Sequence, residues 1–160
     1  MKTACFVLRA QPFHLGHLKV IQWILKKHEK IVIVIGSSKQ SRTESNPFSF
    51  EERKEMIEKT LKSEGINKER YKIIGIPDVH DDKAWVESIL KKVKFDLVYT
   101  RNPWTEECFS LFKIPVKKHP IFGDLSGSKI RNLLRKGKNW EQYVPKEVKR
   151  IIRRVKDKVV

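Results

Sequence analysis

The sequence has few cysteines and no long apolar segment among its 160 residues. Its two cysteines, Cys5 and Cys108, are too few for a disulfide framework and lack the spacing of a metal site, which favours a reducing compartment. No wholly apolar run is longer than five residues, whereas a membrane-spanning helix needs about 20. No signal-peptide pattern precedes the first apolar run. We therefore exclude a disulfide-rich secreted domain and expect a cytoplasmic protein that does not enter a membrane.

Acidic residues are also scarce relative to basic ones. The chain has 35 Lys and Arg against 19 Asp and Glu, a formal net charge of +16. Such an excess raises the local concentration of anions, either nucleotides or nucleic acid, without distinguishing between them. Two absent motifs exclude two classes of nucleotide-binding protein. The Gly-x-Gly-x-x-Gly fingerprint of dinucleotide-binding dehydrogenases and the Walker P-loop do not occur, so both classes are excluded.

What the sequence does contain is a regular alternation of strand and helix patterns. Apolar, β-branched runs predict buried strands, and apolar residues at three- and four-residue spacing predict amphipathic helices. Strands that alternate with helices form parallel sheets, so we predict an α/β fold: a Rossmann-like parallel sheet flanked by helices, with a short helical C-terminal segment over about residues 126–160. At this length we expect one domain over residues 1–160. The predicted strands are Ala4–Leu8, Ile31–Ile35, Tyr71–Ile76, Leu97–Tyr99 and Ile114–Val116, and the predicted helices run from Gly16 to Lys27, from Ser49 past Leu61, from Asp82 to Lys92, from Asn102 onward, from Ser126 to Lys136 and from Pro145 onward.

The most informative segment is residues 9–17, Arg-Ala-Gln-Pro-Phe-His-Leu-Gly-His, between the first strand and the first helix. Ligands of open α/β sheets bind outside the carboxyl ends of the strands, and a helix N-terminus offers free N–H groups and a positive dipole end to an anion. His14 and His17 stand at this junction, and Gly16 leaves the backbone accessible. The segment therefore predicts a phosphate site. A metal site is the alternative, but no cysteine or acidic residue nearby completes one.

Two signatures of one superfamily are present, in the order that the family has. His14-Leu15-Gly16-His17 resembles the His-x-Gly-His signature of the nucleotidyltransferases. Residues 125–131 are similar to their second signature, a Ser-rich turn that ends in Arg at a helix start. Within that superfamily the chain resembles archaeal-type nicotinamide-nucleotide (NMN) adenylyltransferases. The matching segments lie between about residues 4 and 150 and include Arg9 to His14, Asn46-Pro47-Phe48 with Glu52-Arg53, Ala84-Trp85-Val86, Asn102-Pro103, and Trp140 with Val144-Pro145.

This resemblance implies an enzyme of NAD biosynthesis, an adenylyltransferase that transfers AMP from ATP to nicotinamide mononucleotide and releases pyrophosphate. It implies that His17 holds the α-phosphate, that His14 holds the β- or γ-phosphate, and that Arg131 clamps the triphosphate beside them. Mg²⁺ is expected to arrive with ATP and to keep most of its waters, so no protein metal ligands are expected. The implied ATP-binding residues are Arg9, Gln11, Pro12, Phe13, His14, Gly16, His17, Asn102, Ser126, Gly127, Ser128 and Arg131.

The residues implied to bind nicotinamide mononucleotide are Trp85, Asp78 and Asp82. Periodicity alone places Trp85 in an apolar stripe with Ile89 and Leu90, as a core residue. The resemblance instead implies that Trp85 stacks on the nicotinamide ring, a planar cation that an aromatic face attracts. Asp78 either contacts the ribose or the amide, or is only a loop residue. The sequence leaves both alternatives open.

The chain departs from the family pattern near the acceptor. Leu8 stands where a glycine is usual before the first arginine, Arg101 replaces the glycine of a Ser-Gly-Asn-Pro loop, and Lys129 replaces an acid in the second signature. Adenylyl transfer is therefore better supported than nicotinamide specificity. The alternative is adenylyl or cytidylyl transfer to another phosphate acceptor: pantetheine phosphate, flavin mononucleotide (FMN) or glycerol phosphate.

A nucleic-acid-binding protein is the alternative from another class. Residues 145–160 carry seven basic and two acidic side chains, and with the preceding helix they resemble a helix-turn-helix. Basic charge alone is not sequence readout, and the spacing of Val148, Ile151, Ile152 and Val155 predicts a helix that packs on the sheet. We therefore expect ATP and nicotinamide mononucleotide as partners rather than nucleic acid. The resemblance is compatible with a homo-oligomer.

Overall fold

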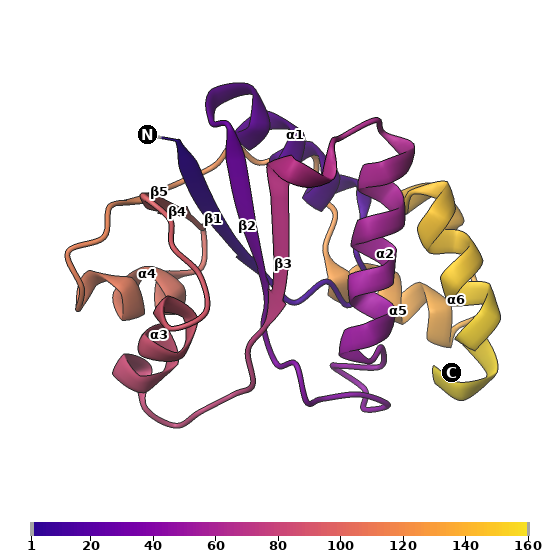
Figure 1. The fold of residues 1–160 in the computed structure, drawn as a ribbon. Helices are drawn as coiled ribbons and strands as arrows, with labels where there is room; N and C mark the ends of the chain where they lie inside the picture. Colours follow the sequence, from indigo (N-terminus) through magenta and orange to yellow (C-terminus); the bar gives the residue numbers. More distant parts are fainter. Residues whose placement is uncertain (1, 160) are drawn as a thin grey trace.

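A parallel sheet forms the centre of the computed structural model, which describes residues 2–159. The strand order is β3-β2-β1-β4-β5, and every neighbouring pair is parallel (Figure 1). The predicted α/β class with a parallel sheet is thus confirmed. The strands are β1 (Thr3–Leu8), β2 (Lys30–Ile35), β3 (Tyr71–Gly75), β4 (Leu97–Tyr99) and β5 (Val116–Lys117).

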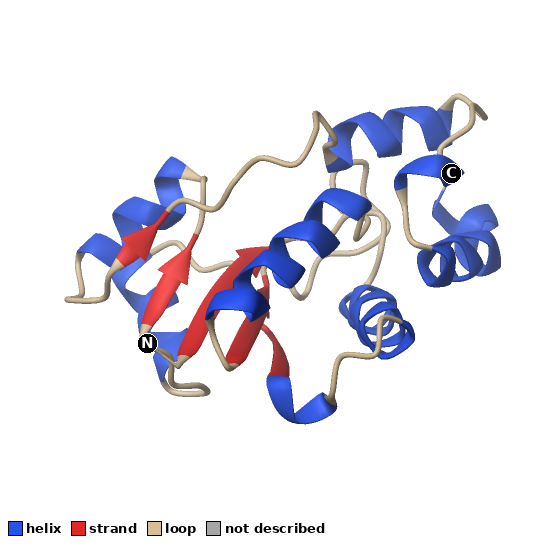
Figure 2. Ribbon diagram, turned by 90° about the horizontal axis from the view of Figure 1, so that it is seen from above, coloured by secondary structure: helices blue, strands red, loops and turns tan. Residues whose placement is uncertain are grey.

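Helices cover both faces of this sheet (Figure 2). Helices α3 and α4 lie on one face, and α1, α2, α5 and α6 lie on the other (Figure 1). No helix within residues 2–159 combines the length and the apolar character needed to cross a membrane. The helices are α1 (Leu15–Lys27), α2 (Phe50–Ser63), α3 (Asp82–Leu90), α4 (Pro103–Ser110), α5 (Gly127–Arg135) and α6 (Lys146–Val159), with short 3₁₀ turns at Lys68–Arg70 and Glu141–Tyr143.

Alternate side chains of the strands enter two separate cores. Phe6 of β1 and Ile33 of β2 face the first core, under α1, α2, α5 and α6. Cys5 and Val34 face the second core, under α3 and α4. Cys108 is buried in the second core as well, and burial raises the pKa of its thiol to about 11. Because both faces of the central strands are covered, their sequences are continuous apolar runs.

The helix starts follow the capping residues that the sequence supplies. Ser49 and Glu52 form a reciprocal capping box at the start of α2: the Ser49 hydroxyl accepts from the Glu52 N–H at 3.1 Å, and the Glu52 carboxylate accepts from the Ser49 N–H at 2.9 Å. Asn102 caps α4, and Ser126 caps α5. Each of these starts was predicted from local sequence.

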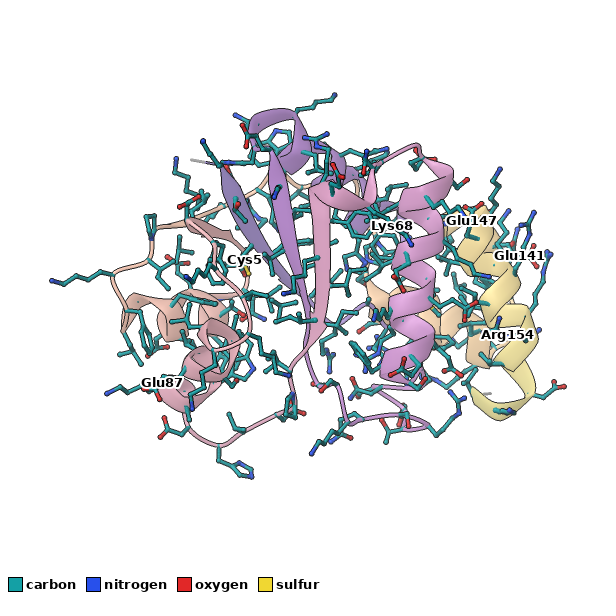
Figure 3. The ribbon with its side chains drawn as sticks, viewed as in Figure 1. Cys5, Lys68, Glu87, Glu141, Glu147 and Arg154 are labelled. Atoms are coloured by element: carbon teal, nitrogen blue, oxygen red, sulfur yellow. The ribbon has the colours of Figure 1, made fainter. Side chains whose placement is uncertain are left out.

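An apolar stripe packs α6 on the first core, as its sequence predicted. On the outer side of the helix, Arg154 donates two hydrogen bonds, of 2.7 and 3.1 Å, to the carboxylate of Glu55 in α2. Arg154 and Glu141 lie on the side of the molecule away from the sheet (Figure 3). The buried residues of the stripe are Val148, Ile151, Ile152 and Val155.

Two elements, β5 and α3, have a boundary that differs from the prediction by two residues, and several others differ by one. The last strand was predicted at Ile114–Val116, but β5 is Val116–Lys117. The Ile114 N–H already donates to the Phe112 carbonyl in a turn, and Pro115 has no N–H to donate to a neighbouring strand. The third helix ends at Leu90 rather than Lys92, because the Lys92 N–H bonds three residues back in a tighter turn.

Candidate active site

The candidate site lies at the carboxyl ends of β1 and β4, where the strand order changes direction. The chain runs from β1 to β2 on one side and later returns to β4 on the other, so the loops after β1 and β4 diverge and leave a crevice. A cleft of about 620 Å³ opens there. Its polar lining comes from Arg9, His14, His17, Thr100, Arg101, Asn102, His119 and Ser126.

His14 and His17 form a stacked pair at the N-terminus of α1. Their ring centroids are 3.6 Å apart, with 18° between the planes. The Nδ1 atom of His14 accepts from the backbone N–H groups of Gly16 and His17, at 3.1 and 3.3 Å. The Nδ1 atom of His17 accepts in turn from the His14 N–H at 3.2 Å. The two histidines therefore replace the Ser and Glu of an ordinary capping box.

These hydrogen bonds fix where each ring carries its proton. A ring nitrogen that accepts from a backbone N–H is unprotonated, so the proton of each neutral imidazole is on Nε2. Burial lowers the pKa of His14 to about 4. Burial, and then the charges of His14 and His119, lower the pKa of His17 well below its usual value. Both rings are therefore neutral near pH 7, and each has an Nε2–H donor suited to a phosphate oxygen.

Gly16 is required by the ring of His14. A Cβ atom at position 16 would lie 2.9 Å from Cε1 and 3.0 Å from Nδ1 of His14. Any side chain would therefore push the imidazole off the N–H groups that it caps. The sequence suggested that Gly16 gives a ligand access to the backbone, and the structure adds this second reason.

Three of the predicted ATP-binding residues lie beneath the cleft rather than along it. Gln11 is 2% exposed, and its side-chain amide makes two hydrogen bonds of 2.9 Å with the backbone of Phe48. Phe13 is fully buried and stacks on His17, with ring centroids 5.6 Å apart. Pro12 is also buried. Phe13 thus supports the ring of His17, Gln11 holds the Phe48 segment, and none of the three lines the cleft.

A buried arginine, Arg53, joins the loops that follow β1 and β2. From α2 its guanidinium donates to the carbonyls of Arg9, Gly36 and Ser37, at 3.0, 2.9 and 3.1 Å, and its Nε–H donates to the Ser49 carbonyl. Burial, and then the nearby charge of Arg9, lower the pKa of Arg53 to about 10, so it is still charged at neutral pH. The sequence identified Arg53 only as part of a family motif.

The start of α5 closes another side of the cleft. Ser126 and Gly127 line it, and Arg131 lies behind them. The Arg131 guanidinium donates to the Gln11 carbonyl at 2.8 Å and to the Ser128 hydroxyl at 3.1 Å. A Cβ atom at Gly127 would lie 2.7 Å from Nη1 of Arg131. Glycine therefore lets α5 approach the loop after β1 closely enough for Arg131 to reach it.

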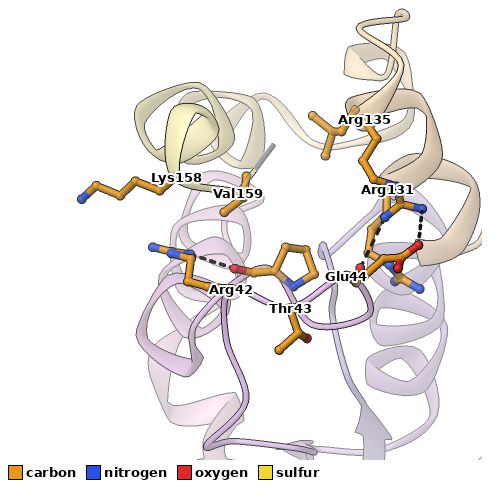
Figure 4. A pocket seen from close by; sticks show the side chains of 9 residues that line it. Arg42, Thr43, Glu44, Arg131, Arg135, Lys158 and Val159 are labelled. Atoms are coloured by element: carbon orange, nitrogen blue, oxygen red, sulfur yellow. Dashed lines mark hydrogen bonds and ion pairs between the residues drawn. The ribbon is translucent and has the colours of Figure 1, made fainter.

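Arg131 also lines a separate basic hollow of about 450 Å³ between the loop before α2 and the ends of α5 and α6 (Figure 4). Arg42, Arg135 and Lys158 surround the same hollow. Arg42 donates to a backbone carbonyl at 2.8 Å and pairs with Glu52 at 2.6 Å, Arg135 pairs with Glu44 at 3.8 Å, and Arg131 has the two partners given above. Arg131 thus lies between this hollow and the cleft at the strand ends.

A smaller cavity of about 210 Å³ adjoins the cleft. Arg9 and Asn102 line both spaces, so they form the border between them. Asp78 and Trp85, two of the residues predicted to bind nicotinamide mononucleotide, line the smaller cavity. The Asp78 carboxylate accepts from the Ser37 hydroxyl at 2.9 Å.

The third predicted residue, Asp82, is not among the described residues that line either space. It begins α3, and its carboxylate accepts a hydrogen bond of 3.1 Å from the indole Nε1–H of Trp104. Trp104 itself lines the smaller cavity. Among the three predicted residues, Asp82 alone is thus outside the lining of the smaller cavity, and it bonds to a residue that is part of that lining, Trp104.

Sequence reasoning missed His119 and Trp104 as site residues. His119 follows β5 and lines the cleft; its Nδ1 is 2.9 Å from the Pro120 carbonyl. Arg101, noted only as a departure from the family pattern, donates to the His119 carbonyl at 2.8 Å. The rule that ligands bind beyond the carboxyl ends of strands would have singled out both residues.

Replacing Trp85 with alanine is expected to lower the free energy of unfolding by about 3–5 kcal/mol, through lost burial and the cavity left behind. Trp85 is 3% exposed, and its ring packs against Phe109 at 5.8 Å between centroids. Calorimetry should show Tm falling by about 6–20 °C, with a smaller fall for Trp85→Phe. An unchanged Tm in the alanine variant would contradict a role for Trp85 in the core.

The donors of the cleft suit an anion. Imidazole, guanidinium, hydroxyl and amide groups line it, and none of its described lining residues carries a carboxylate. Within residues 2–159 there is no group of three or more side chains able to hold a metal ion. The cleft can therefore neutralise the negative charge of a ligand at several points.

Comparison with known proteins relates the chain to nucleotide-transferring enzymes. A family model described as cytidylyltransferase-like matches residues 9–133. The chain is 39% identical to a nicotinamide-nucleotide adenylyltransferase of Thermoplasma volcanium, over 95% of this chain and 86% of that protein. It is 38% identical to one of Saccharolobus solfataricus, over 98% and 92% of the two chains.

The fold also matches a solved structure, a bifunctional NMN adenylyltransferase/ADP ribose pyrophosphatase from Francisella tularensis complexed with AMP and a manganese ion. The TM-score is 0.84 at 24% identity. The match covers 96% of this chain and 49% of the other, so this chain spans about half the length of that protein.

Proposed function

The chain belongs to the family of nicotinamide-nucleotide adenylyltransferases, and on that basis we propose that it transfers AMP from ATP to nicotinamide mononucleotide, giving NAD and pyrophosphate. The observation that carries the proposal is the stacked pair of His14 and His17, with two Nε2–H donors in a cleft that adjoins a cavity walled by tryptophans. The cleft suits a triphosphate, and the smaller cavity suits a planar ring.

The reaction needs no nucleophile from the protein. A phosphate oxygen of nicotinamide mononucleotide attacks the α-phosphorus of ATP in line, so the protein has to position both substrates and neutralise charge. His17 donates to the α-phosphate, where charge grows in the transition state, and His14 donates to the β- or γ-phosphate. Both rings enter the reaction as neutral donors whose orientation the backbone fixes.

Other groups around the cleft take the remaining phosphate oxygens. Ser126 and the free N–H groups of α5 lie on one side, and Arg9 lies at the border with the smaller cavity. Arg131 and Ser128 stand behind them and share a hydrogen bond. In this arrangement Arg131 gives up its hydrogen bond to the Gln11 carbonyl and donates to a phosphate oxygen of ATP instead.

A magnesium ion fits this chemistry as a partner of the nucleotide. The cleft offers no carboxylate among its described lining residues, so the ion would be held by phosphate oxygens and water, as Mg²⁺ commonly is. When bound, the ion neutralises charge on the triphosphate. The protein's own contribution is the set of imidazole, guanidinium and N–H donors.

The direct test is to follow pyrophosphate release from ATP and Mg²⁺ with a panel of acceptors. We expect nicotinamide mononucleotide to be used, and pantetheine phosphate, FMN and glycerol phosphate to be poor acceptors. Turnover with one of these compounds instead would support adenylyl transfer but contradict nicotinamide mononucleotide as the acceptor. Titration of ATP and of a long polynucleotide at increasing salt tests the nucleic-acid alternative, since polyanion binding falls steeply with salt.

Replacing Arg131 with alanine should weaken both ATP binding and turnover, each by about 10- to 100-fold, because charge-assisted hydrogen bonds are lost. Arg131→Lys should not restore either quantity. The guanidinium reaches two acceptors at once in a planar fork, which an ammonium cannot do. Steady-state KM and kcat with Tm measured in parallel check this, and a fully active lysine variant would show that only a point charge is needed.

We propose that residues 1–160 form one nucleotidyltransferase domain and that the protein is located in the reducing cytoplasm. The cleft draws on segments from Arg9 to Gly127, and Cys5 and Cys108 are free thiols. A single calorimetric transition supports one domain, cell fractionation tests the compartment, and gel filtration reports whether copies associate.

A further inference from the structure

The basic hollow between the loop before α2 and the ends of α5 and α6 is a second cavity suited to an anion (Figure 4). Its volume of about 450 Å³ lies within the range of small-molecule sites. None of its described lining residues is aromatic, so it has no face on which a nucleobase could stack. The charged side chains that line it are those of Arg42, Arg131, Arg135, Lys158 and one acid, Glu44. The hollow therefore suits phosphate groups rather than a nucleoside.

Arg131 faces this hollow with a charge that the protein does not neutralise. It is 9% exposed, and it lines the hollow but is not among the described residues that line the cleft at the strand ends. Its two hydrogen-bond acceptors, the Gln11 carbonyl and the Ser128 hydroxyl, are uncharged. Within residues 2–159 no carboxylate forms an ion pair with it. Because a buried charge without a counter-ion is costly, an anion in the hollow would stabilise Arg131.

Arg135 adds a second guanidinium on the same face of α5. It lies one helical turn beyond Arg131, a spacing at which like charges repel. Burial, and then the charges of Arg9 and Arg135, lower the pKa of Arg131. The carboxylate partner of Arg135 is Glu44, at 3.8 Å and with its side chain 81% exposed. Exposed pairs of this kind contribute little free energy, so a ligand anion can displace Glu44 and lie against both arginines.

Arg42 holds a third guanidinium on the opposite side of the hollow (Figure 4). It donates to the Pro47 carbonyl at 2.8 Å and to the Glu52 carboxylate at 2.8 and 2.6 Å. Glu52 offsets much of the charge of Arg42 but fixes its position. Because the guanidinium groups stand on opposite sides of the hollow, a chain of linked phosphate groups can reach more of them than a single phosphate can.

We propose that this hollow is a second anion site, separate from the catalytic cleft, and that it binds a short inorganic polyphosphate. Arg131 and Arg135 hold the anion, Arg42 contacts its far end, and Glu44 competes with it for Arg135. Since Arg131 also serves the proposed ATP site, the anion weakens ATP binding, and ATP weakens binding of the anion by the same factor. The site itself does not depend on the proposed function, whereas this coupling does.

The binding test is calorimetric titration with inorganic tripolyphosphate at constant ionic strength. The wild type should show two binding events, one in the hollow and one in the cleft. Arg135→Ala should weaken the first event about 10-fold, because a charged hydrogen-bond donor is lost. Glu44→Gln should strengthen it severalfold, because the competing carboxylate is removed. Arg9→Ala should weaken only the second event, since Arg9 lines the cleft and not the hollow.

Two controls make the titration specific. Arg150→Ala removes the same charge as Arg135→Ala from an exposed position on α6 outside the hollow. It should leave both affinities within about twofold, because exposed distant charges are screened. Orthophosphate should bind the hollow about 10-fold more weakly than tripolyphosphate, because it makes fewer charge-assisted hydrogen bonds. Equal affinities for the two anions would overturn the assignment to a polyphosphate.

The remaining outcomes separate the site, its coupling to ATP and the proposed function. An affinity unchanged in both Arg135→Ala and Glu44→Gln, each folded with the wild-type Tm, overturns the site. Without tripolyphosphate, Arg135→Ala should keep the wild-type KM for ATP; a severalfold rise would show that the hollow holds the end of the ATP triphosphate and is not a separate site. If saturating ATP leaves tripolyphosphate binding in the hollow unchanged, the coupling is wrong. A wild type without adenylyl transfer overturns the proposed function and leaves the titrations valid.

Discussion

Replacing His17 with alanine is expected to lower kcat by about 10²–10³-fold while the fold is retained, as loss of one preorganised donor to transition-state charge typically does. The His17 Nδ1 atom is committed to the His14 N–H, so the Nε2–H is the donor that the reaction loses. The ring also takes part in the cap of α1, whose loss costs about 1 kcal/mol of stability. That cost is too small to unfold the protein, so the loss of kcat is measurable in folded enzyme.

The measurement is steady-state turnover with saturating ATP and acceptor, with circular dichroism and Tm on the same preparation. His80→Ala is the matched control, because His80 is exposed in the segment between β3 and α3, and it should leave kcat unchanged. His17→Asn restores an N–H donor at a shorter reach and should recover part of the lost rate. Near-normal turnover in folded His17→Ala would remove His17 from the mechanism.

Arg53→Ala is expected to lower the free energy of unfolding by about 3–5 kcal/mol, because several backbone carbonyls lose a charged hydrogen-bond donor and a large buried side chain is removed. The guanidinium donates to the carbonyls of Arg9, Gly36 and Ser37. Removing it leaves these acceptors without that donor around a space that the side chain filled. In a chain of this length we expect Tm to fall by about 6–20 °C.

Two companion variants make this result specific. Arg53→Lys supplies one ammonium in place of the fork and should give an intermediate Tm. Arg150→Ala removes an exposed arginine from α6 and should change the free energy of unfolding by no more than about 0.5 kcal/mol. If Arg53→Ala kept the wild-type Tm, water would have to satisfy the carbonyls of Arg9, Gly36, Ser37 and Ser49 as well as the Arg53 side chain does.

Local sequence predicted the elements of the fold because each carried its own signal. An apolar run marked β1 and a β-branched apolar run marked β2, and the Ser49-to-Glu52 capping box and the Asn102-Pro103 pair marked two helix starts. The boundary of β5 was missed because it depends on which backbone groups around Pro115 face a neighbouring strand. Pro115 was a local signal against a strand start at Ile114, but the register of Val116 and Lys117 beside β4 comes from the pairing of distant segments.

The residues of the candidate site also fall into two groups, those that local sequence predicted and those that it missed. His14, Gly16 and His17 were predicted because one junction of strand and helix places all three residues. Arg53 and Trp104 were not, because their partners come from separate loops: the carbonyls that Arg53 binds follow β1 and β2, and the indole of Trp104 meets Asp82 from α3. Periodicity identified Trp85 as a core residue, and its burial confirms this.

The two cores of the sheet have a consequence for how new acceptors arise in such a protein. Apart from Arg9, the groups proposed to hold the triphosphate lie on or directly before α1 and α5, which cover the first core, whereas Trp85 and Trp104 belong to α3 and α4, which cover the second. A change in the second core can therefore reshape the acceptor pocket without repacking the helices that hold the phosphates. In the proposed arrangement, the groups that serve the donor and those that serve the acceptor thus depend mainly on helices from opposite faces of the sheet.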